Sequence, residues 1–599
     1  MCGIFGYKGI SSDATNIVLN GLKKLEYRGY DSWGFASFQE GKIKIKKEIG
    51  RIPNYSTDFT SHLSIGHTRW ATHGQVTANN AHPHTSKDKK VVAVHNGIIE
   101  NVSELVEKYK LEKETETDSE IIPLLINHFM DEGYSFVNAT KKACLQFNGS
   151  YAIALINKDS EELIAVKMGS PIILGIGENE FLLSSDIPAL LEHTNKVVYL
   201  EDKDFVHINK HISISKIDSE TKIIPDIKTI SWNADSAEKE GYDHFMLKEI
   251  FQQPSSIRKT LDGLVENGFP SLNLKKIHLE DFKRITILGC GTSWHSGLVG
   301  KFLIESLARI PVDVEYASEF RYRNPIIDKD TLILAISQSG ETADTLAALR
   351  EAKRRGASVL SICNVVESSI ARESDDILYT RAGPEIGVAS TKAFTTQVTM
   401  LYLLTAQLVL KNKSLSENKV KEMIVDIKKI PELIELVLKE EKNIKVLANK
   451  LSKKNNALYL GRGIQFPIAL EGALKLKEVS YIHAEGYPAA EMKHGPIALI
   501  DKNMPCVVIA TKDILTYDKI LSNIQEIKAR GGEVIAIGTK GDFKLKELVD
   551  DIIYVPETRY SLTPLLSIIP LQILSYHVAL LRSCDIDKPR NLAKSVTVE

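Results

Sequence analysis

The second half of this sequence contains the same pattern twice, and this repeat limits the possible folds more than any other feature. From residue 281 onward, short aliphatic runs are each followed by small residues and then by a stretch with helical spacing, as in parallel α/β units. Four of these runs recur about 172 to 175 residues further along the chain. The pairs are 284–289 and 457–461, 332–336 and 507–510, 358–362 and 533–537, and 376–379 and 551–554. Two tandem copies of one α/β domain are therefore expected, each with a parallel, flavodoxin-like sheet.

The first 230 residues have a different pattern, in which strand-like runs dominate and long helical periods are few. This pattern predicts an α+β layered domain, followed by a polar, charged hinge. We expect these boundaries in a multi-domain chain: the α+β domain at 2–230, a linker and connecting helix at 231–274, the first α/β domain at 275–415, a helical connector at 416–446, the second α/β domain at 447–588, and a C-terminal tail at 589–599.

The composition excludes several classes of partner and cofactor. A net charge of -2 with 25% charged residues gives no attraction to a polyanion, so no nucleic-acid partner is expected. The six cysteines lie far apart without CxxC pairs or zinc-ligand spacing, which predicts no metal site and a reducing cytoplasm. Two apolar stretches, 398–410 and 565–581, are shorter than the roughly 20 residues that span a bilayer. We interpret both as core helices and expect no membrane partner.

Cys2 directly follows the initiator methionine, and a small residue at this position allows that methionine to be removed. The thiol and a free α-amine would then belong to one residue. An α-amine has a pKa of about 8, so near neutral pH it can accept the thiol proton as the base beside a nucleophile. Position alone favours the alternative, an ordinary small residue in a frayed terminus or in a first strand.

Two polar segments strengthen the catalytic interpretation of Cys2. Residues 67–74 contain a guanidinium, an indole, two hydroxyls and two imidazoles, and Arg69 can bind a carboxylate through two hydrogen bonds. The residues His95, Asn96 and Gly97 end an apolar strand, and the backbone at a glycine can approach an oxyanion. Asn-Gly is also the commonest hairpin turn, and spacing alone favours that turn.

Six segments of the first domain resemble, in residue type and order, the class II glutamine amidotransferases, which are N-terminal nucleophile hydrolases with a four-layer α+β fold. These segments are 2–4, 26–32, 67–74, 81–84, 95–101 and 115–118. The resemblance implies that Cys2 is the nucleophile and that Asn96 and Gly97 stabilise the oxyanion. It further implies Arg69 on the α-carboxylate of glutamine, Asp118 on its α-ammonium, Thr72 and His73 in the same pocket, and Trp70 at the passage through which ammonia leaves.

Polar loops also follow two strands of the first α/β copy. Residues 289–293 and 337–342 each lie between a strand and a helix, where hydroxyls and backbone N–H groups can bind a phosphate. Neither loop has the GK[ST] of a nucleotide-binding loop. For either loop alone, serines that only cap a helix are the better interpretation. Loops after adjacent parallel strands, however, meet at one edge of the sheet, where ligands bind.

The second copy lacks these serines and has charged residues instead. Lys475 and Glu478 are one helical turn apart, so both can address one substrate, although a surface salt bridge is the commoner meaning of this spacing. His494 lies beside a Gly-Pro turn. From spacing alone, Lys594 is a solvated lysine of the tail.

The tandem domains are similar to sugar isomerase domains. Joined to the first domain, they resemble the isomerising glutamine:fructose-6-phosphate amidotransferases over essentially the whole chain. The segments specific to that family are 319–322, 337–345, 385–394, 469–478, 493–496 and 588–599. The resemblance implies L-glutamine and fructose 6-phosphate as substrates, glucosamine 6-phosphate as product, a cytoplasmic homodimer and no cofactor.

The same resemblance assigns the sugar site. It implies that the phosphate is held by Ser293, Ser337, Gln338, Ser339 and Thr342, with Val388 and Ser390 near the sugar. It also implies that Lys594 forms an imine, that Glu478 moves a proton between C1 and C2 with the help of Lys475, and that His494 from a partner subunit opens the ring. An imine at C2 activates that carbon toward ammonia, and a carboxylate can then move the proton that makes the aldose.

Two other functions were compared with this one. Another class II amidotransferase would need a diphosphate-binding acidic run or an ATP-pyrophosphatase loop, and the sequence has neither. A non-catalytic sugar-phosphate sensor would not need Glu478, His494 or Lys594. Trp33, in place of a small residue, and the run that begins at Pro488 depart from the family pattern. No long insertion follows the first domain, so feedback by a UDP-sugar is not expected.

Overall fold

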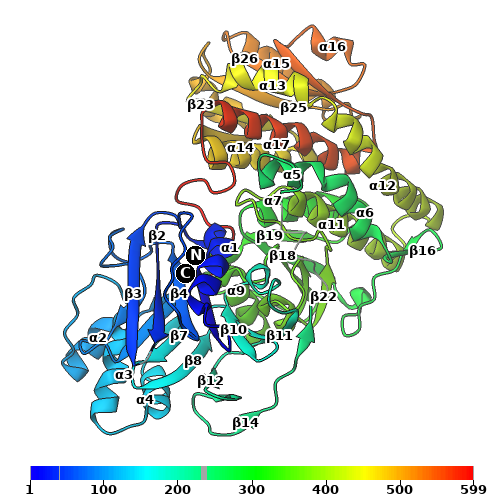
Figure 1. Ribbon diagram of the computed structural model, residues 1–599. Coiled ribbons are helices and arrows are strands. Elements are labelled where there is room, and N and C mark those ends of the chain that lie inside the picture. The colour runs from blue at the N-terminus through cyan, green and yellow to red at the C-terminus, as the bar shows by residue number, and fades with distance from the viewer. Residues whose placement is uncertain (1, 40, 231–238, 598–599) are drawn as a thin grey trace. The chain divides into compact units, whose positions relative to one another are not determined.

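The computed structural model describes residues 2–39, 41–230 and 239–597, and it divides into two compact units (Figure 1). Unit 1 comprises Met1–Glu238 together with Ala593–Glu599, and unit 2 comprises Lys239–Leu592. The first part of the predicted linker, residues 231–238, lies outside the described residues, as do residues 598–599 of the predicted tail. Each unit has its own hydrophobic core, so the two are described separately.

The described part of unit 1 contains two antiparallel sheets. The first has the order β15 (Lys228–Thr229), β11 (Lys196–Tyr199), β9 (Ile173–Ile176), β10 (Glu180–Ser184), β1 (Gly3–Gly9), β4 (Leu63–Arg69), β2 (Ser32–Gln39) and β3 (Lys42–Ile49). The second has the order β14 (Lys222–Ile223), β13 (Ile212–Lys216), β12 (Asp204–Ile208), β8 (Ser160–Met168), β7 (Gly149–Asn157), β6 (Val91–Ile99) and β5 (His84–Thr85).

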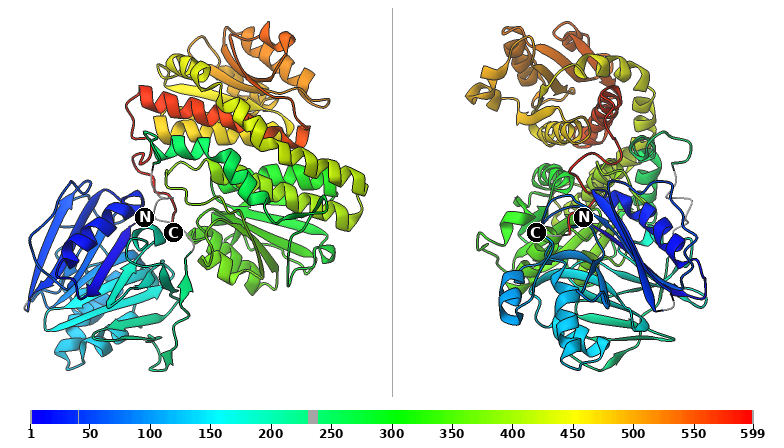
Figure 2. Two further views of the ribbon diagram at one scale, coloured as in Figure 1. Left: turned by 45° about the vertical axis from the view of Figure 1, so that its right-hand side comes forward. Right: turned by 60° about the vertical axis from the view of Figure 1, so that its left-hand side comes forward.

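Helices cover the outer face of each sheet, which gives four layers (Figure 2). On the first sheet lies α1 (Ala14–Leu25); on the second lie α2 (Val102–Tyr109), α3 (Ile121–Asp131) and α4 (Phe136–Cys144). Strand β6 shows why the sheets are covered on both faces, because successive side chains of a strand point to opposite faces of the sheet. Val92 and Val94 lie in the core between the sheets, whereas Val91 and Ala93 pack beneath the helices. The predicted four-layer α+β fold is confirmed.

Unit 2 contains two five-stranded parallel sheets in its described residues. The first has the order β19 (Val312–Tyr316), β18 (Arg284–Gly289), β20 (Thr331–Ser337), β21 (Ser358–Cys363) and β22 (Asp376–Tyr379). The second has the order β24 (His483–Pro488), β23 (Asn456–Gly461), β25 (Pro505–Ala510), β26 (Glu533–Thr539) and β27 (Asp551–Val555). In both sheets the second strand in the chain flanks the first, which is the flavodoxin-like order. The predicted tandem α/β sheets are confirmed.

The helices of unit 2 share one hydrophobic core across both copies. Ile287 and Leu401 of the first copy belong to the same core cluster as Tyr459 and Leu571 of the second. The first copy carries α7 (Thr292–Leu303), α8 (Ala317–Phe320), α9 (Ala343–Arg354), α10 (Ser369–Glu373) and α11 (Lys392–Asn412); the second carries α14 (Phe466–Ser480), α15 (Tyr517–Lys528), α16 (Phe543–Lys546) and α17 (Thr563–Leu581); α5 (Phe245–Phe251) and α6 (Gln253–Leu261) precede them, and α12 (Glu417–Leu438) and α13 (Glu441–Leu451) connect them.

Two long apolar helices, α11 and α17, are long enough to span a bilayer, but 89% of the apolar window of each is buried inside unit 2. Helix α11 packs on α7, and α17 packs on α14. Both are therefore buried core helices of unit 2, as expected from the sequence.

Candidate active sites

Cys2 immediately precedes β1 and lies against the backbone of Trp70. The Trp70 N–H donates to the Cys2 sulfur at 3.4 Å, and that sulfur lies 3.5 Å from the Trp70 carbonyl oxygen. Burial raises the pKa of the Cys2 thiol, although the Trp70 N–H acts against this effect. A thiol with a raised pKa is a poor nucleophile until a base removes its proton.

Asn96 and Gly97, near the end of β6, lie beside Cys2. The Asn96 Nδ2 donates to the Cys2 carbonyl oxygen at 3.1 Å and to the Ser185 hydroxyl at 2.8 Å. Gly97 has a φ of 129°, and a Cβ at this position would lie 1.9 Å from the carbonyl oxygen of Ser150, so no side chain fits. Both residues pair with β7 within a continuous strand. The hairpin turn favoured by spacing alone is therefore wrong.

Arg69, the last residue of β4, shapes the loop that follows it. Its Nη1 donates to the Gln75 carbonyl at 3.2 Å, and its Nη2 donates to the carbonyls of His73 and Gly74 at 2.5 and 3.2 Å. Thr72 and His73 are exposed on this loop, with the Thr72 hydroxyl 3.4 Å from the His73 Nδ1. The guanidinium is thus held by three carbonyl groups at the edge of the Cys2 site.

Asp118 is fixed to the same strand as Asn96, because its Oδ2 accepts a hydrogen bond from the Ile99 N–H at 2.8 Å. Its negative charge raises the pKa of the Cys2 thiol and the positive charge of Arg69 lowers it, so both charges lie near the sulfur. Unit 1 therefore brings together the predicted residues Cys2, Arg69, Trp70, Asn96, Gly97 and Asp118.

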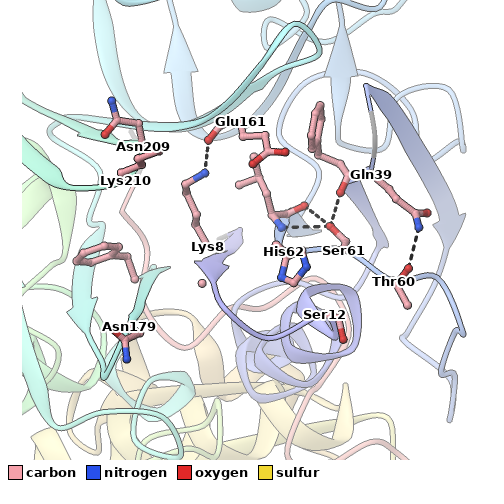
Figure 3. A pocket seen from close by; sticks show the side chains of 14 residues that line it. Lys8, Ser12, Gln39, Thr60, Ser61, His62, Glu161, Asn179, Asn209 and Lys210 are labelled. Carbon is pink, nitrogen blue, oxygen red and sulfur yellow. Dashed lines mark hydrogen bonds between the residues drawn. The ribbon is translucent and has the colours of Figure 1, made fainter.

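A separate pocket of about 630 Å³ lies at the other end of β1 (Figure 3). Lys8, His62 and Lys210 are among its lining residues, and the Lys8 ammonium donates to the Glu161 carbonyl. A strand rises about 3.3 Å per residue, so the length of β1 puts this pocket roughly 20 Å from Cys2. The pocket is not part of the Cys2 site.

The two predicted phosphate loops lie at one edge of the first sheet of unit 2, because β18 and β20 are neighbouring parallel strands. After β20, the Ser337 hydroxyl lies 3.2 Å from the Thr342 hydroxyl and accepts a hydrogen bond from the Gly340 N–H at 3.0 Å. Thr342 is the N-cap residue of α9, but its side chain makes no capping hydrogen bond. The capping interpretation is therefore wrong for Thr342, whose hydroxyl is turned toward the loop.

The other three predicted phosphate ligands lie on the same two loops. Ser293 is in the first turn of α7, and its hydroxyl accepts a hydrogen bond from the Gln397 side chain at 3.0 Å. Gln338 and Ser339 follow β20, where the Ser339 hydroxyl accepts from the Glu341 N–H at 3.2 Å. Five hydroxyl or amide side chains thus gather on two loops at one sheet edge.

Glu385 holds the segment that contains Val388 and Ser390. Its two carboxylate oxygens accept hydrogen bonds from the Ser390 hydroxyl and the Thr391 N–H, each at 2.9 Å. Val388 is buried, and its N–H donates to the Asp587 carbonyl at 3.1 Å. A carboxylate with several donors fixes one conformation of the chain that leads into α11.

Lys475 and Glu478 do not form a surface salt bridge. Lys475 is completely buried, and its Nζ lies 2.6 Å from a Glu478 oxygen and 3.4 Å from a Glu471 oxygen. The same Nζ donates to the Thr292 hydroxyl of α7 at 3.2 Å. Because Thr292 immediately precedes Ser293, the ion pair lies next to the first phosphate loop. The surface interpretation is wrong, since helical spacing shows which residues are neighbours but not whether they are buried.

Comparisons with known proteins agree with this geometry. A family model described as a SIS domain matches residues 278–407 and 450–582, and one described as a glutamine amidotransferase domain matches residues 67–192. The glutamine–fructose-6-phosphate aminotransferases (isomerizing) of Chlorobaculum tepidum and Bacteroides thetaiotaomicron are each 48% identical to this chain, over 618 and 616 residues, with all of both chains covered. The chain belongs to this family of isomerising aminotransferases.

A solved structure of an aminotransferase of this kind is also similar to the chain. It is the C-terminal domain of glucosamine-fructose-6-phosphate aminotransferase from Francisella tularensis, with 44% identity and a TM-score of 0.57. The match covers 58% of this chain and 99% of that domain.

The aminotransferase family implies two further residues for catalysis, His494 and Lys594. His494 is exposed at the end of the short helix Glu491–His494. Lys594 lies in the tail that groups with unit 1. Of the departures from the family, Trp33 is 1% exposed and fills the core beneath α1, whereas Pro488 ends β24. The roles of His494 and Lys594 stay predictions.

Sequence reasoning missed the residues that hold the predicted site residues in place. The His67 Nε2 donates to the His95 carbonyl at 2.9 Å, and the His82 Nδ1 accepts from the His95 N–H at 3.3 Å, so the strand before Asn96 is fixed on both sides. In unit 2, sequence reasoning also missed Glu471, which lies 3.4 Å from the Lys475 ammonium and 2.7 Å from the His295 Nδ1. The concentration of histidines in segments 67–74, 81–84 and 95–101 was the available signal.

Proposed function

We propose that the chain makes glucosamine 6-phosphate from fructose 6-phosphate and glutamine in two half-reactions, one centred in each unit. The full-length identity of 48% to named aminotransferases supports the overall reaction. The geometric observation that supports a catalytic sugar site is the buried Lys475–Glu478 pair beside Ser293. Burying two charges carries a large desolvation cost, and a sensor that only binds a sugar phosphate has no use for such a pair.

In the glutamine half, the Cys2 sulfur attacks the amide carbon of glutamine, and the α-amine of the processed residue takes the thiol proton. The Asn96 amide and the Gly97 N–H stabilise the negative oxygen that forms. Collapse of this intermediate releases ammonia and leaves a thioester, which water hydrolyses to glutamate. Arg69 and Asp118 hold the α-carboxylate and α-ammonium of the substrate, with Thr72 and His73 at the rim.

In the sugar half, the two loops of unit 2 bind the phosphate, with Val388 and Ser390 beside the sugar. His494 from a second subunit opens the ring, and Lys594 forms an imine at C2 that ammonia then displaces. Glu478 moves a proton between C1 and C2 to give the aldose. Burial lowers the pKa of Lys475, but Glu471 and Glu478 outweigh burial and raise it, so Lys475 stays charged and stabilises the Glu478 carboxylate.

Ammonia passes between the half-reactions inside the protein, with Trp70 at the passage. Internal transfer keeps ammonia from becoming ammonium, which has no lone pair for attack on the imine. The proposal includes a cytoplasmic homodimer, because His494 acts from a second subunit, and no cofactor, because proton transfer and imine formation need only side chains.

The decisive variant is Cys2→Ala, measured with two assays on the same preparation. Glutamine hydrolysis and glutamine-dependent formation of glucosamine 6-phosphate should both disappear, because no thioester can form. Conversion of fructose 6-phosphate to glucose 6-phosphate without glutamine should continue within about threefold of the wild-type rate, since it uses only the sugar site. If glutamine-driven product persisted, Cys2 would not be the nucleophile.

A further inference from the structure

Helix α14 presents three charged side chains to the interior of unit 2. Glu471, Lys475 and Glu478 are spaced by four and three residues, so they lie on one face of the helix. The side chains of Glu471 and Lys475 are 0% exposed and that of Glu478 is 20% exposed. Two carboxylates therefore share one ammonium group in the interior. A buried carboxylate needs further donors, because its desolvation is costly.

The donors for Glu471 come from the other copy of the domain. The His295 Nδ1 lies 2.7 Å from one oxygen of Glu471, and the Thr292 hydroxyl donates to the other oxygen at 3.0 Å. Both belong to the first turns of α7, on either side of Ser293. Burial alone would raise the pKa of Glu471, but Lys475, His295 and Thr292 hold it below its usual value, so it stays a carboxylate.

A continuous series of contacts therefore runs from the phosphate loop to Glu478. His295 holds Glu471, Glu471 attracts Lys475, and Lys475 lies against Glu478. If Glu471 lost its contact with His295, it could turn toward Lys475 and draw the ammonium away from Glu478. The position of Glu478 then depends on a residue two places beyond Ser293.

We propose that His295 is a positioning residue for the isomerisation half-reaction: by holding Glu471 it keeps Lys475 against Glu478, and so keeps the Glu478 carboxylate where it can move the proton of the sugar. The inference rests on the proposed role of Glu478. Stability alone does not explain the network, since apolar residues packed between two helices stabilise at least as well as a buried ion pair.

The test compares His295→Leu, which removes the donor, with His295→Asn, which keeps an N–H group. Conversion of fructose 6-phosphate to glucose 6-phosphate is measured without glutamine. For His295→Leu, kcat should fall about 10- to 100-fold while KM changes less than about threefold, because the phosphate loops are intact and only proton transfer is impaired. His295→Asn should recover kcat to within about fivefold. Glutamine hydrolysis in unit 1 should not change, and the nearly unchanged KM for fructose 6-phosphate shows that unit 2 is folded.

Glu471→Gln tests the contact between His295 and Glu471 from the Glu471 side. It is the variant to use if His295→Leu does not fold. It should lower kcat to a similar extent, and the double variant His295→Leu with Glu471→Gln should be no slower than the slower single variant, since both break one series. Any of three results would overturn the inference. The first is a kcat within threefold of wild type in both single variants, the second is a KM that rises as kcat falls, and the third is a double variant whose loss of kcat is the product of the two single losses. The proposed role of Glu478 is separate: full isomerisation by Glu478→Gln would refute that role whatever His295 does.

Discussion

At the scale of single residues, backbone geometry decides which side chains the Cys2 site accepts. Gly97 combines a φ of 129°, which side chains rarely adopt, with a Cβ position 1.9 Å from the Ser150 carbonyl oxygen. The absent side chain lets β6 lie close to β7 at Gly97, whose N–H is the oxyanion donor in the proposed reaction. Asn96 supplies a second donor from the same strand.

Gly97→Ala should therefore lower glutamine hydrolysis by at least about 100-fold, the cost of losing one oxyanion donor. Isomerisation of fructose 6-phosphate without glutamine should be unchanged, and it serves as the control for unit 2. Gly133→Ala is the matched control for backbone strain, because Gly133 also has a positive φ, 96°, with no atom within 4 Å of an added Cβ. Equal losses in both variants would mean that strain, not the oxyanion site, explains the effect.

At the scale of elements, four buried histidines join β4, β5 and β6 near the Cys2 site. The rings of His67 and His82 are stacked with centroids 3.9 Å apart, and His84 and His95 lie around them. Burial lowers the pKa of all four, that of His67 to about 3. These elements are therefore held together by neutral imidazoles.

Unit 1 should lose stability as the pH falls below 6.5. The folded pKa of His67 lies below that of the unfolded chain, so in this window protons bind the unfolded chain and favour unfolding. Between pH 6.5 and 5, His67 alone should lower the free energy of unfolding of unit 1 by about 2 kcal/mol. The urea midpoint for loss of glutaminase activity should show the decline. His67→Gln keeps a donor for the His95 carbonyl but cannot titrate, so it should have a shallower decline; an identical decline would contradict the assignment.

Helix α9 offers a second test at this scale, because Thr342 stands at its N-cap without a capping hydrogen bond. Thr342→Val keeps the shape and removes the hydroxyl. Stability should change by less than about 0.5 kcal/mol, against about 1 kcal/mol for loss of a working cap. The KM for fructose 6-phosphate should rise about 10-fold, the effect of one lost hydrogen bond to a charged group. A large loss of stability with an unchanged KM would restore the capping interpretation.

At the scale of the whole molecule, the sequence predicts the layers and the repeat because periodicity reports which faces are buried. Residues 332–336 of β20 and 506–510 of β25 are apolar throughout, as parallel strands covered on both faces must be. Periodicity does not report contacts between distant segments. It could not show that Lys475 is buried against Thr292 of the other copy, or that His82 supports the strand of Asn96. The role of Lys594 has no local signal at all and depends on family resemblance.

Lys594 lies in the tail that groups with unit 1, whereas the loops that the proposal assigns to the sugar phosphate belong to unit 2. Lys594→Arg keeps the charge, but a guanidinium does not form the imine. Isomerisation should fall at least about 1,000-fold, since a covalent step is lost, while fructose 6-phosphate binding changes less than about threefold.

Borohydride reduction in the presence of fructose 6-phosphate provides the direct measurement. In the wild type it should fix the sugar on the C-terminal peptide, detectable by mass spectrometry, and in Lys594→Arg it should fix none. Glutamine hydrolysis should persist in the variant, which separates loss of the imine from loss of the fold. An adduct on another lysine would assign the imine to that lysine, and isomerisation that survives the substitution would show that the reaction does not need Lys594.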